Sequence, residues 1–139
     1  MSHNWELGQI GEELAATYLM NKGYRILHRN WNLHRGCELD IVAMKDGKLH
    51  FVEVKTRSRA YEWKGGRPEE AVDIRKLRNM GRAIMYYRAY FHRTEEFCID
   101  IIGIIYRSDS DYDLNFMENI SIPVKSTCYT SRGKYTKYS

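Results

Sequence analysis

The fold is decided by residues 38–55, which read ELDIVAMKDGKLHFVEVK. Apolar, β-rich segments flank the Asp46-Gly47 pair, and such a pair is a strong signal for a two-residue hairpin turn. If these two residues form the turn, the antiparallel register places Val42 opposite Phe51. The stretch therefore predicts two antiparallel β-strands joined by a tight reversal.

Four charged side chains fall on one face of this predicted hairpin. The same register places Asp40 opposite Glu53 and Glu38 opposite Lys55, and side chains alternate between the faces of a strand. Like charges directly opposite each other destabilise a sheet, so Asp40 and Glu53 need a reason to meet. A divalent cation held by both carboxylates would remove their repulsion. The alternative is a solvated polar edge with a Glu38–Lys55 ion pair.

Three segments in this order resemble the YraN-like family, which is similar to archaeal Holliday-junction resolvases. They are GQIGE at 8–12, ELDIVA at 38–43 and FVEVKTR at 51–57. Asp40 followed by Glu53 and Lys55 also resembles the PD-(D/E)XK nuclease signature. Leu39 stands in place of the signature's Pro, and Cys37 stands where the family usually has Gly.

The resemblance covers about residues 4–105, with a weaker similarity at 116–120. It implies a restriction-endonuclease-like α/β fold, a three-layer sandwich with a mixed central sheet flanked by helices. The expected order is helix, strand, strand, strand, helix, strand, since the hairpin makes the middle pair antiparallel. It also implies a metal-dependent endonuclease that hydrolyses phosphodiester bonds in DNA, with branched recombination intermediates as candidate substrates. RNA and a homodimeric assembly stay open.

Each candidate catalytic residue has an expected role. Asp40 and Glu53 would bind Mg²⁺ or Mn²⁺, with the Val54 carbonyl as a third ligand. Lys55 would orient or help deprotonate the attacking water and stabilise charge on phosphorus. Glu12, which the resemblance places near the hairpin face, would hold a water molecule of the ion or a second ion. The alternative for Glu12 is an exposed helix residue.

The basic residues are concentrated downstream of the carboxylates. The chain carries a formal net charge of +4, and residues 57–93 hold ten Lys/Arg against four Asp/Glu. A polyanion approaching the predicted acidic face would meet this segment. A basic surface helix that serves only solubility is the alternative. The candidate nucleic-acid-binding residues are Arg57, Arg59, Lys64, Arg75, Lys76 and Arg78.

Periodicity predicts the remaining elements. Apolar residues at helical spacing predict helices over 4–21 and 74–90, and Asp73 is suited to cap the second helix. Residues 24–31 read as a strand with Tyr24, Ile26 and His28 on one face. An isoleucine-rich strand over 97–106 is expected to be buried on both faces, so its Asp100 needs a structural partner; 112–124 could add one short edge strand.

Length and composition favour one soluble domain. The 139 residues suggest a nuclease-like domain over 1–124 and a basic tail over 125–139. Three cysteines without paired spacing favour a reducing cytoplasm, and no Cys/His spacing indicates zinc, so we expect none. No segment resembles a membrane span. A non-catalytic nucleic-acid-binding or assembly protein on the same fold is the alternative function.

Overall fold

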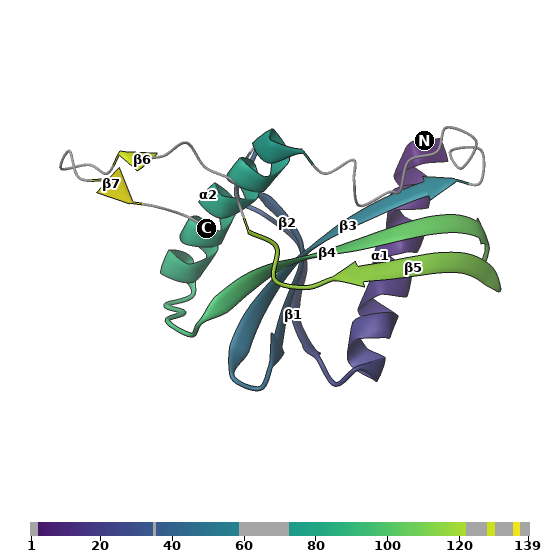
Figure 1. The fold of residues 1–139 in the computed structure, drawn as a ribbon, viewed down its shortest axis with the longest axis horizontal. Helices are drawn as coiled ribbons and strands as arrows, with labels where there is room; N and C mark the ends of the chain where they lie inside the picture. Colours follow the sequence, from purple (N-terminus) through teal and green to yellow (C-terminus); the bar gives the residue numbers. More distant parts are fainter. Residues whose placement is uncertain (1–2, 35, 59–72, 122–127, 130–134, 137–139) are drawn as a thin grey trace.

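The computed structural model describes residues 3–34, 36–58, 73–121, 128–129 and 135–136 (Figure 1). Arg59 and Lys64, and most of the predicted tail at 125–139, lie outside the described residues. The elements are α1 (His3–Asn21), β1 (Arg25–Asn32), β2 (Glu38–Lys45), β3 (Lys48–Ser58), α2 (Ile74–Tyr90), β4 (Phe97–Ser108), β5 (Asp111–Met117), β6 (Cys128–Tyr129) and β7 (Tyr135–Thr136).

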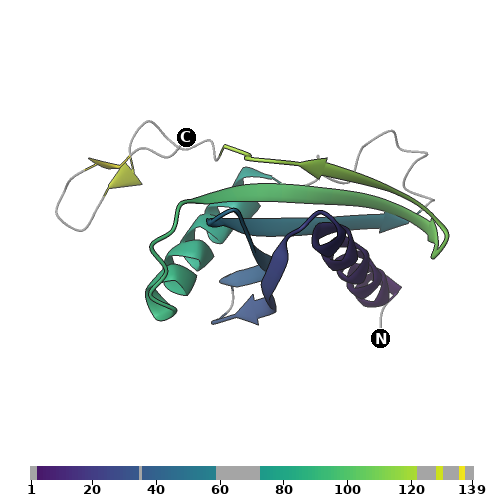
Figure 2. The same cartoon turned by 90° about the horizontal axis from the view of Figure 1, so that it is seen from below.

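The central feature is a five-stranded mixed sheet in the order β1-β2-β3-β4-β5. Only β3 and β4 run parallel in this sheet, and α2 connects them, as a parallel pair requires. In Figure 2, β1 and β2 turn down between α1 and α2. The predicted α/β class, mixed sheet and element order are confirmed, and the architecture is consistent with a restriction-endonuclease-like sandwich. The short strands β6 and β7 pair separately.

The hairpin has the predicted register from the turn as far as Ile41 and Val52. The predicted oppositions of Asp40 with Glu53 and of Glu38 with Lys55 lie beyond the end of this ladder. Asp46 and Gly47 both adopt positive φ angles, 51° and 76°, which a two-residue turn between twisted strands favours. Val42 pairs with Phe51, as the sequence predicts. Asp tolerates this left-handed conformation better than most residues and Gly adopts it freely, so the turn sequence itself fixes which residues of β2 and β3 face each other.

Two hydrophobic cores lie on the two faces of the sheet. One is built around Phe51 and Tyr87 and packs beneath α2. The other joins Leu19 of α1 with Val52 and Ile102 of the central strands. Both faces of β3 and β4 are therefore covered, which explains their nearly continuous apolar sequences. The cores fix both helices against the two central strands.

Local signals account for the ends of the helices. Gly23 follows α1 with φ 91°, a left-handed conformation that suits the predicted stop. At the start of α2, the Asp73 carboxylate accepts the backbone N–H of Lys76 at 2.8 Å. The predicted cap and the bounds of the second helix are confirmed. This cap sets where the first turn of α2 lies relative to the sheet.

The prediction for the faces of β1 is wrong at His28. The pairing of β1 with β2 shifts register between Ile26 and His28, which marks a bulge or irregularity. Ile26 and Tyr24 belong to the α1 core, but the His28 ring packs against Phe91 and its Nδ1 lies 2.6 Å from the Tyr87 hydroxyl. The irregularity sends the side chain to the α2 face.

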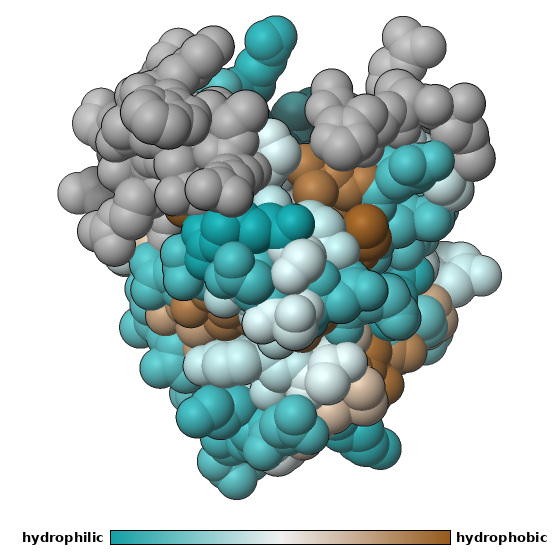
Figure 3. All heavy atoms as spheres, turned by 90° about the vertical axis from the view of Figure 1, so that its right-hand side faces the viewer, coloured by the Kyte–Doolittle hydropathy of each residue, from teal (hydrophilic) through white to brown (hydrophobic). Residues whose placement is uncertain are grey.

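The edge strand β5 also differs from its prediction. It starts at Asp111, one residue before the predicted segment 112–124, and ends at Met117, well before the predicted end. Its antiparallel pairing with β4 begins at Ser108, so the connection between the two strands is short. Neither described helix has the length and hydrophobicity that a bilayer crossing requires. The face drawn in Figure 3 is mostly hydrophilic, with hydrophobic residues in small separate areas.

Candidate active site

The candidate site lies where β2 and β3 stop pairing. Their ladder runs as far as Ile41 and Val52. One residue further on, Asp40 Oδ2 accepts the Val54 backbone N–H at 2.9 Å. The Asp40 carboxylate thus replaces a strand partner. Because the N–H and C=O of one strand residue point to the same side, the Val54 carbonyl is directed toward Asp40 as well.

Glu53 is the most unusual residue of the site. It is only 4% exposed, and its Oε1 is buried without a hydrogen-bond partner among the described residues. Burial, followed by repulsion from Asp40, raises the pKa of Glu53 to about 8. An acid in this environment is destabilised when ionised, unless a cation compensates its charge.

Among the described residues, Lys76 is the cation that forms an ion pair with Glu53. Its Nζ lies 3.6 Å from Glu53 Oε2, and its side chain is 40% exposed. Burial opposes the charge on Lys76, but attraction by Glu53 and then Asp40 outweighs it and raises the pKa of the amine. The first turn of α2 thereby brings a positive charge to the two acids. The sequence could not separate Lys76 from its basic neighbours, whereas the geometry does.

Glu12 approaches the same acids from α1. Burial, then the negative charge of Asp40, raises the pKa of Glu12. The neighbouring Gly11 allows this approach, since a β-carbon there would overlap Thr56 Oγ1 and lie 2.8 Å from Thr56 Cβ. The close contact between the helix and β3 therefore requires glycine, and it holds Glu12 near the fork between β2 and β3.

Lys55 and Glu38 do not form the ion pair expected of a solvated edge. Among the described residues, no salt bridge joins them. Glu38 is exposed and pairs with Asn32 of β1, and its charge contributes to the raised pKa of Lys76. Lys55 is half-buried on β3, two residues after Glu53 and so on the same face of the strand.

The candidate nucleic-acid-binding residues that the structure describes lie on two elements, β3 and α2. Arg75 and Arg78 are exposed on the first turns of α2. Arg57 lies near the end of β3, where one guanidinium nitrogen donates to the Thr56 carbonyl at 3.1 Å. Arg75 and Arg78 share the first turns of α2 with Lys76, and exposed guanidinium groups suit contact with phosphate oxygens.

Comparison with known proteins shows which family the chain is related to. A family profile described as "Uncharacterised protein family UPF0102" matches residues 11–104, most of the chain. The chain belongs to UPF0102. The YraN-like resemblance found in the sequence is therefore confirmed. The matched region contains Glu12, both hairpin acids and the whole of α2.

Other UPF0102 proteins align along most of their length. One from Syntrophomonas wolfei is 47% identical over 103 residues, covering 73% of this chain and 86% of the relative. One from Bacteroides thetaiotaomicron is 44% identical over 105 residues, covering 76% and 84%. One from Clostridium perfringens strain 13 is 36% identical over 120 residues, covering 84% and 94%. The UPF0102 fold thus spans nearly all of these relatives.

A second group of polar residues was not predicted as a site. His50, Cys98 and Asp100 form a buried candidate metal-binding cluster on β3 and β4. The sequence does contain a signal, because Asp100 lies in a strand buried on both faces and needs a partner. That partner is His50, whose Nδ1 lies 2.7 Å from Asp100 Oδ2. The parallel pairing of β3 with β4, which the sequence analysis did not derive, brings them together.

Adjacent glutamates on α1 test the placement of Glu12. Glu12→Gln removes the charge that repels Asp40, so we expect a weaker response of thermal stability to Mn²⁺ and a pH profile that differs from the wild type. Glu13→Gln is the matched control, because Glu13 is exposed and pairs with Arg29. Titration of the melting temperature with Mn²⁺ measures both. Equal changes in the two variants would contradict a role for Glu12 in the site.

Proposed function

We propose that this UPF0102 protein is a metal-dependent endonuclease that hydrolyses phosphodiester bonds in DNA. The observation that carries the proposal is the pair Asp40 and Glu53 at the fork of β2 and β3. One carboxylate is fixed by the Val54 N–H, and the other has a buried oxygen without a partner among the described residues. Stability alone does not require two acids at such a place.

The donor set fits a hard divalent cation. Mg²⁺ and Mn²⁺ prefer oxygen ligands, and Asp40, Glu53 and the Val54 carbonyl supply only oxygen. The orphaned Oε1 of Glu53 is an available ligand atom. When bound, such an ion supplies Lewis-acid stabilisation of the phosphate and activation of a water molecule. Glu12 is close enough to Asp40 for the two charges to interact, and it could contribute to the same region.

The lysines of the site have separate tasks. Lys55 shares a face of β3 with Glu53, so its amine would orient the nucleophilic water and stabilise the charge that develops on phosphorus. The Lys76 Nζ lies 3.6 Å from Glu53 Oε2, and its partly exposed amine can turn toward a phosphate when a cation binds the two acids. The protein's own charges therefore prepare the site for an anionic substrate.

The surface around the site suits a nucleic-acid backbone. Arg57, Arg75 and Arg78 present donors from β3 and α2 without forming a groove-reading motif. We therefore propose structure-dependent rather than sequence-dependent recognition, with branched DNA as the preferred substrate and RNA as a competitor to test. Cleavage of two strands of a junction would call for a homodimer. For a DNA substrate of this kind, we propose that the protein acts in the cytoplasm.

Cleavage assays with branched, flapped and linear DNA test this proposal. We expect cleavage that depends on Mg²⁺ or Mn²⁺ and falls at least about 100-fold in Asp40→Ala and in Lys55→Ala. Asp111→Ala, at the edge strand and in an ion pair with Arg107, is a control that should retain activity. Activity that survives both site substitutions would exclude this site.

The alternative is a nucleic-acid-binding or assembly protein that has no catalytic activity. It would bind branched DNA with a steep dependence on salt concentration, and cut none of the substrates with either metal. Measurement of binding and cleavage on the same DNA separates the two functions. Binding by the wild type and by Asp40→Ala, without cleavage by either, would favour the alternative.

A further inference from the structure

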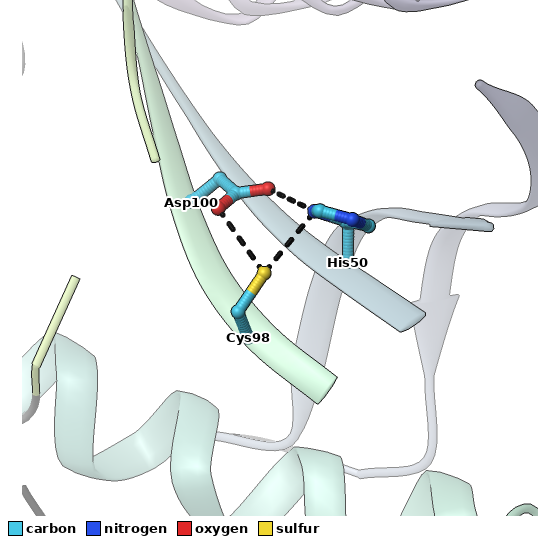
Figure 4. A group of neighbouring side chains, drawn as sticks. All are labelled: His50, Cys98 and Asp100. Atoms are coloured by element: carbon cyan, nitrogen blue, oxygen red, sulfur yellow. Dashed lines mark hydrogen bonds and ion pairs between the residues drawn. The ribbon is translucent and has the colours of Figure 1, made fainter. Parts of the chain in front are cut away.

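A second cluster of ionisable side chains lies apart from the candidate active site. His50 of β3 pairs in register with Cys98 of β4, and Asp100 follows two residues later on the same face. All three are buried, with Asp100 at 0% exposure. Figure 4 shows their side chains pointing toward one another from the two strands. Two adjacent strands in the middle of a sheet therefore hold three donor groups in place.

The three side chains of the cluster all lie within contact distance of one another. His50 Nδ1 lies 2.7 Å from Asp100 Oδ2 and 3.1 Å from Cys98 Sγ, and Cys98 Sγ lies 3.4 Å from Asp100 Oδ1. A nitrogen, a sulfur and a carboxylate therefore converge on one small region between the two strands. A shared electron-pair acceptor would satisfy all three atoms.

The arrangement does not suit nucleophilic catalysis. A Cys–His–Asp triad needs the thiol on one ring nitrogen and the carboxylate on the other. Here Cys98 and Asp100 both contact Nδ1 of His50. Burial, and then the negative charge of Asp100, raises the pKa of Cys98 to about 12, which suppresses the thiolate that a nucleophile requires. The donors instead converge on one point, as ligands do.

We infer that His50, Cys98 and Asp100 form a binding site for a zinc-like divalent metal ion. Zinc binds mixed donor sets of this kind, with one sulfur, one imidazole nitrogen and one carboxylate oxygen. Hard cations such as Mg²⁺ instead prefer oxygen ligands. The three donor atoms all lie within 4.8 Å of one another. This site is separate from Asp40 and Glu53, and it does not rest on the proposed nuclease function.

Metal entry requires only small movements. Zinc–ligand bonds of about 2.0–2.3 Å in a tetrahedron separate the ligand atoms by about 3.3–3.6 Å. The distances from His50 Nδ1 to Asp100 Oδ2, 2.7 Å, and to Cys98 Sγ, 3.1 Å, would therefore lengthen by about 0.4–0.6 Å, which side-chain rotation can provide. Three protein ligands leave a fourth position for solvent or a further group, and His50, with 9% exposure, offers the way in.

Neighbouring groups already hold the ligands in the required orientation. The Asn119 backbone N–H donates to Asp100 Oδ1 at 2.8 Å, which leaves Oδ2 for the shared point. The Tyr24 ring packs edge-on against His50, with ring centroids 4.9 Å apart, and the Tyr24 hydroxyl donates to Glu118. Such supporting contacts fix the orientation of ligands in protein metal sites. The ligand atoms of the cluster thus point to one place, and neighbouring groups restrict the movement of their side chains.

The linear sequence did not reveal this site, and our expectation of no zinc followed from spacing alone. Cys98 and Asp100 are only two residues apart, whereas His50 is distant in sequence and joins them through the parallel pairing of β3 and β4. Zinc-finger spacings place ligands within loops and helices. A ligand set that spans two neighbouring parallel strands has no such pattern.

Cobalt substitution in the intact protein tests the inference. We expect one Co²⁺ per chain to give sulfur-to-cobalt charge-transfer absorption, which disappears in Cys98→Ser and is removed from the wild type by Zn²⁺. The double variant Cys37→Ser/Cys128→Ser leaves Cys98 as the remaining cysteine and should keep the absorption. Because a proton leaves the thiol, the apparent affinity should rise about tenfold per pH unit.

One further variant and a measurement of thermal stability complete the test. Asp40→Ala should keep the charge-transfer absorption, since an ion between Asp40 and Glu53 has only oxygen ligands. Zn²⁺ should raise the melting temperature of the wild type, and Cys98→Ser should weaken Zn²⁺ binding at least about 100-fold. Absence of sulfur-to-cobalt absorption in a folded wild-type protein, or its persistence in Cys98→Ser, would overturn the inference.

Discussion

Glu53→Gln should give a protein that is more stable than the wild type and inactive as a nuclease. The pKa of Glu53 is raised from 4.5 to about 8 by burial and then by Asp40, so the folded state disfavours the charged form. The unfolded chain ionises this side chain above pH 4.5 without that cost. Gln keeps the shape of the neutral acid and removes the difference.

The pH dependence follows from the sign of this shift. Below pH 4.5, Glu53 is protonated in both states, and the two proteins should be equally stable in this respect. Between pH 4.5 and about 8 the folded wild type holds a proton that the unfolded chain has lost, so its stability falls as pH rises; above that range the difference stays constant. At about 1.4 kcal/mol per pKa unit, we expect Glu53→Gln to gain about 4–5 kcal/mol at pH 8.

Chemical denaturation at a series of pH values, without metal, measures this gain. Asp40→Asn is an informative companion, because the amide oxygen can still accept the Val54 N–H while the charge that repels Glu53 is gone. Its stability should therefore depend less on pH than that of the wild type. Added Mn²⁺ should stabilise the wild type and not Glu53→Gln. Identical denaturation midpoints for wild type and Glu53→Gln at pH 8 would refute the assignment.

Gly11→Ala should destabilise the protein by about 2–4 kcal/mol, although alanine favours helices. The added methyl group would overlap Thr56 Oγ1 and lie 2.8 Å from Thr56 Cβ. Thr56 Cβ is attached directly to the backbone of β3, so it cannot turn away as the end of a long side chain would. The helix must move off the sheet, and Glu12 moves with it.

Gly8→Ala is the matched control on the same helix. No atom lies within 4 Å of a β-carbon at Gly8, so the substitution has space. Its higher helix propensity should stabilise the protein by about 0.5–1 kcal/mol. Thermal denaturation of both variants gives the comparison, and a stabilised Gly11→Ala would show that α1 is not in close contact with β3.

Short-range chemistry explains how much of the structure the sequence predicts. The Asp46-Gly47 turn sets the register of β2 and β3, and Asp73 sets the start of α2, because each signal acts within a few residues. The approach of Asp40 and Glu53 follows directly from that turn. The α/β class follows from the order of these elements and from the family resemblance.

Long-range geometry accounts for what the sequence does not predict. The shift of register in β1 turns His28 toward Tyr87, and no local residue pattern predicts this shift. The contact between Lys76 and Glu53 depends on how α2 packs on the sheet. The partnership of His50 with Asp100 depends on parallel pairing across an intervening helix. Each of these three contacts forms only when the strands and helices have come together, so none of them can be predicted from neighbouring residues.

The mixture of local and distant strand pairing also bears on the order of folding. A hairpin with a two-residue turn closes in about 1–10 μs, whereas the parallel pairing of β3 with β4 must first close a long loop that includes α2. The two acids thus meet while water still surrounds them. Their charges become confined only when β4 and α2 dock, so the electrostatic cost of the candidate site falls on the later, slower steps of folding.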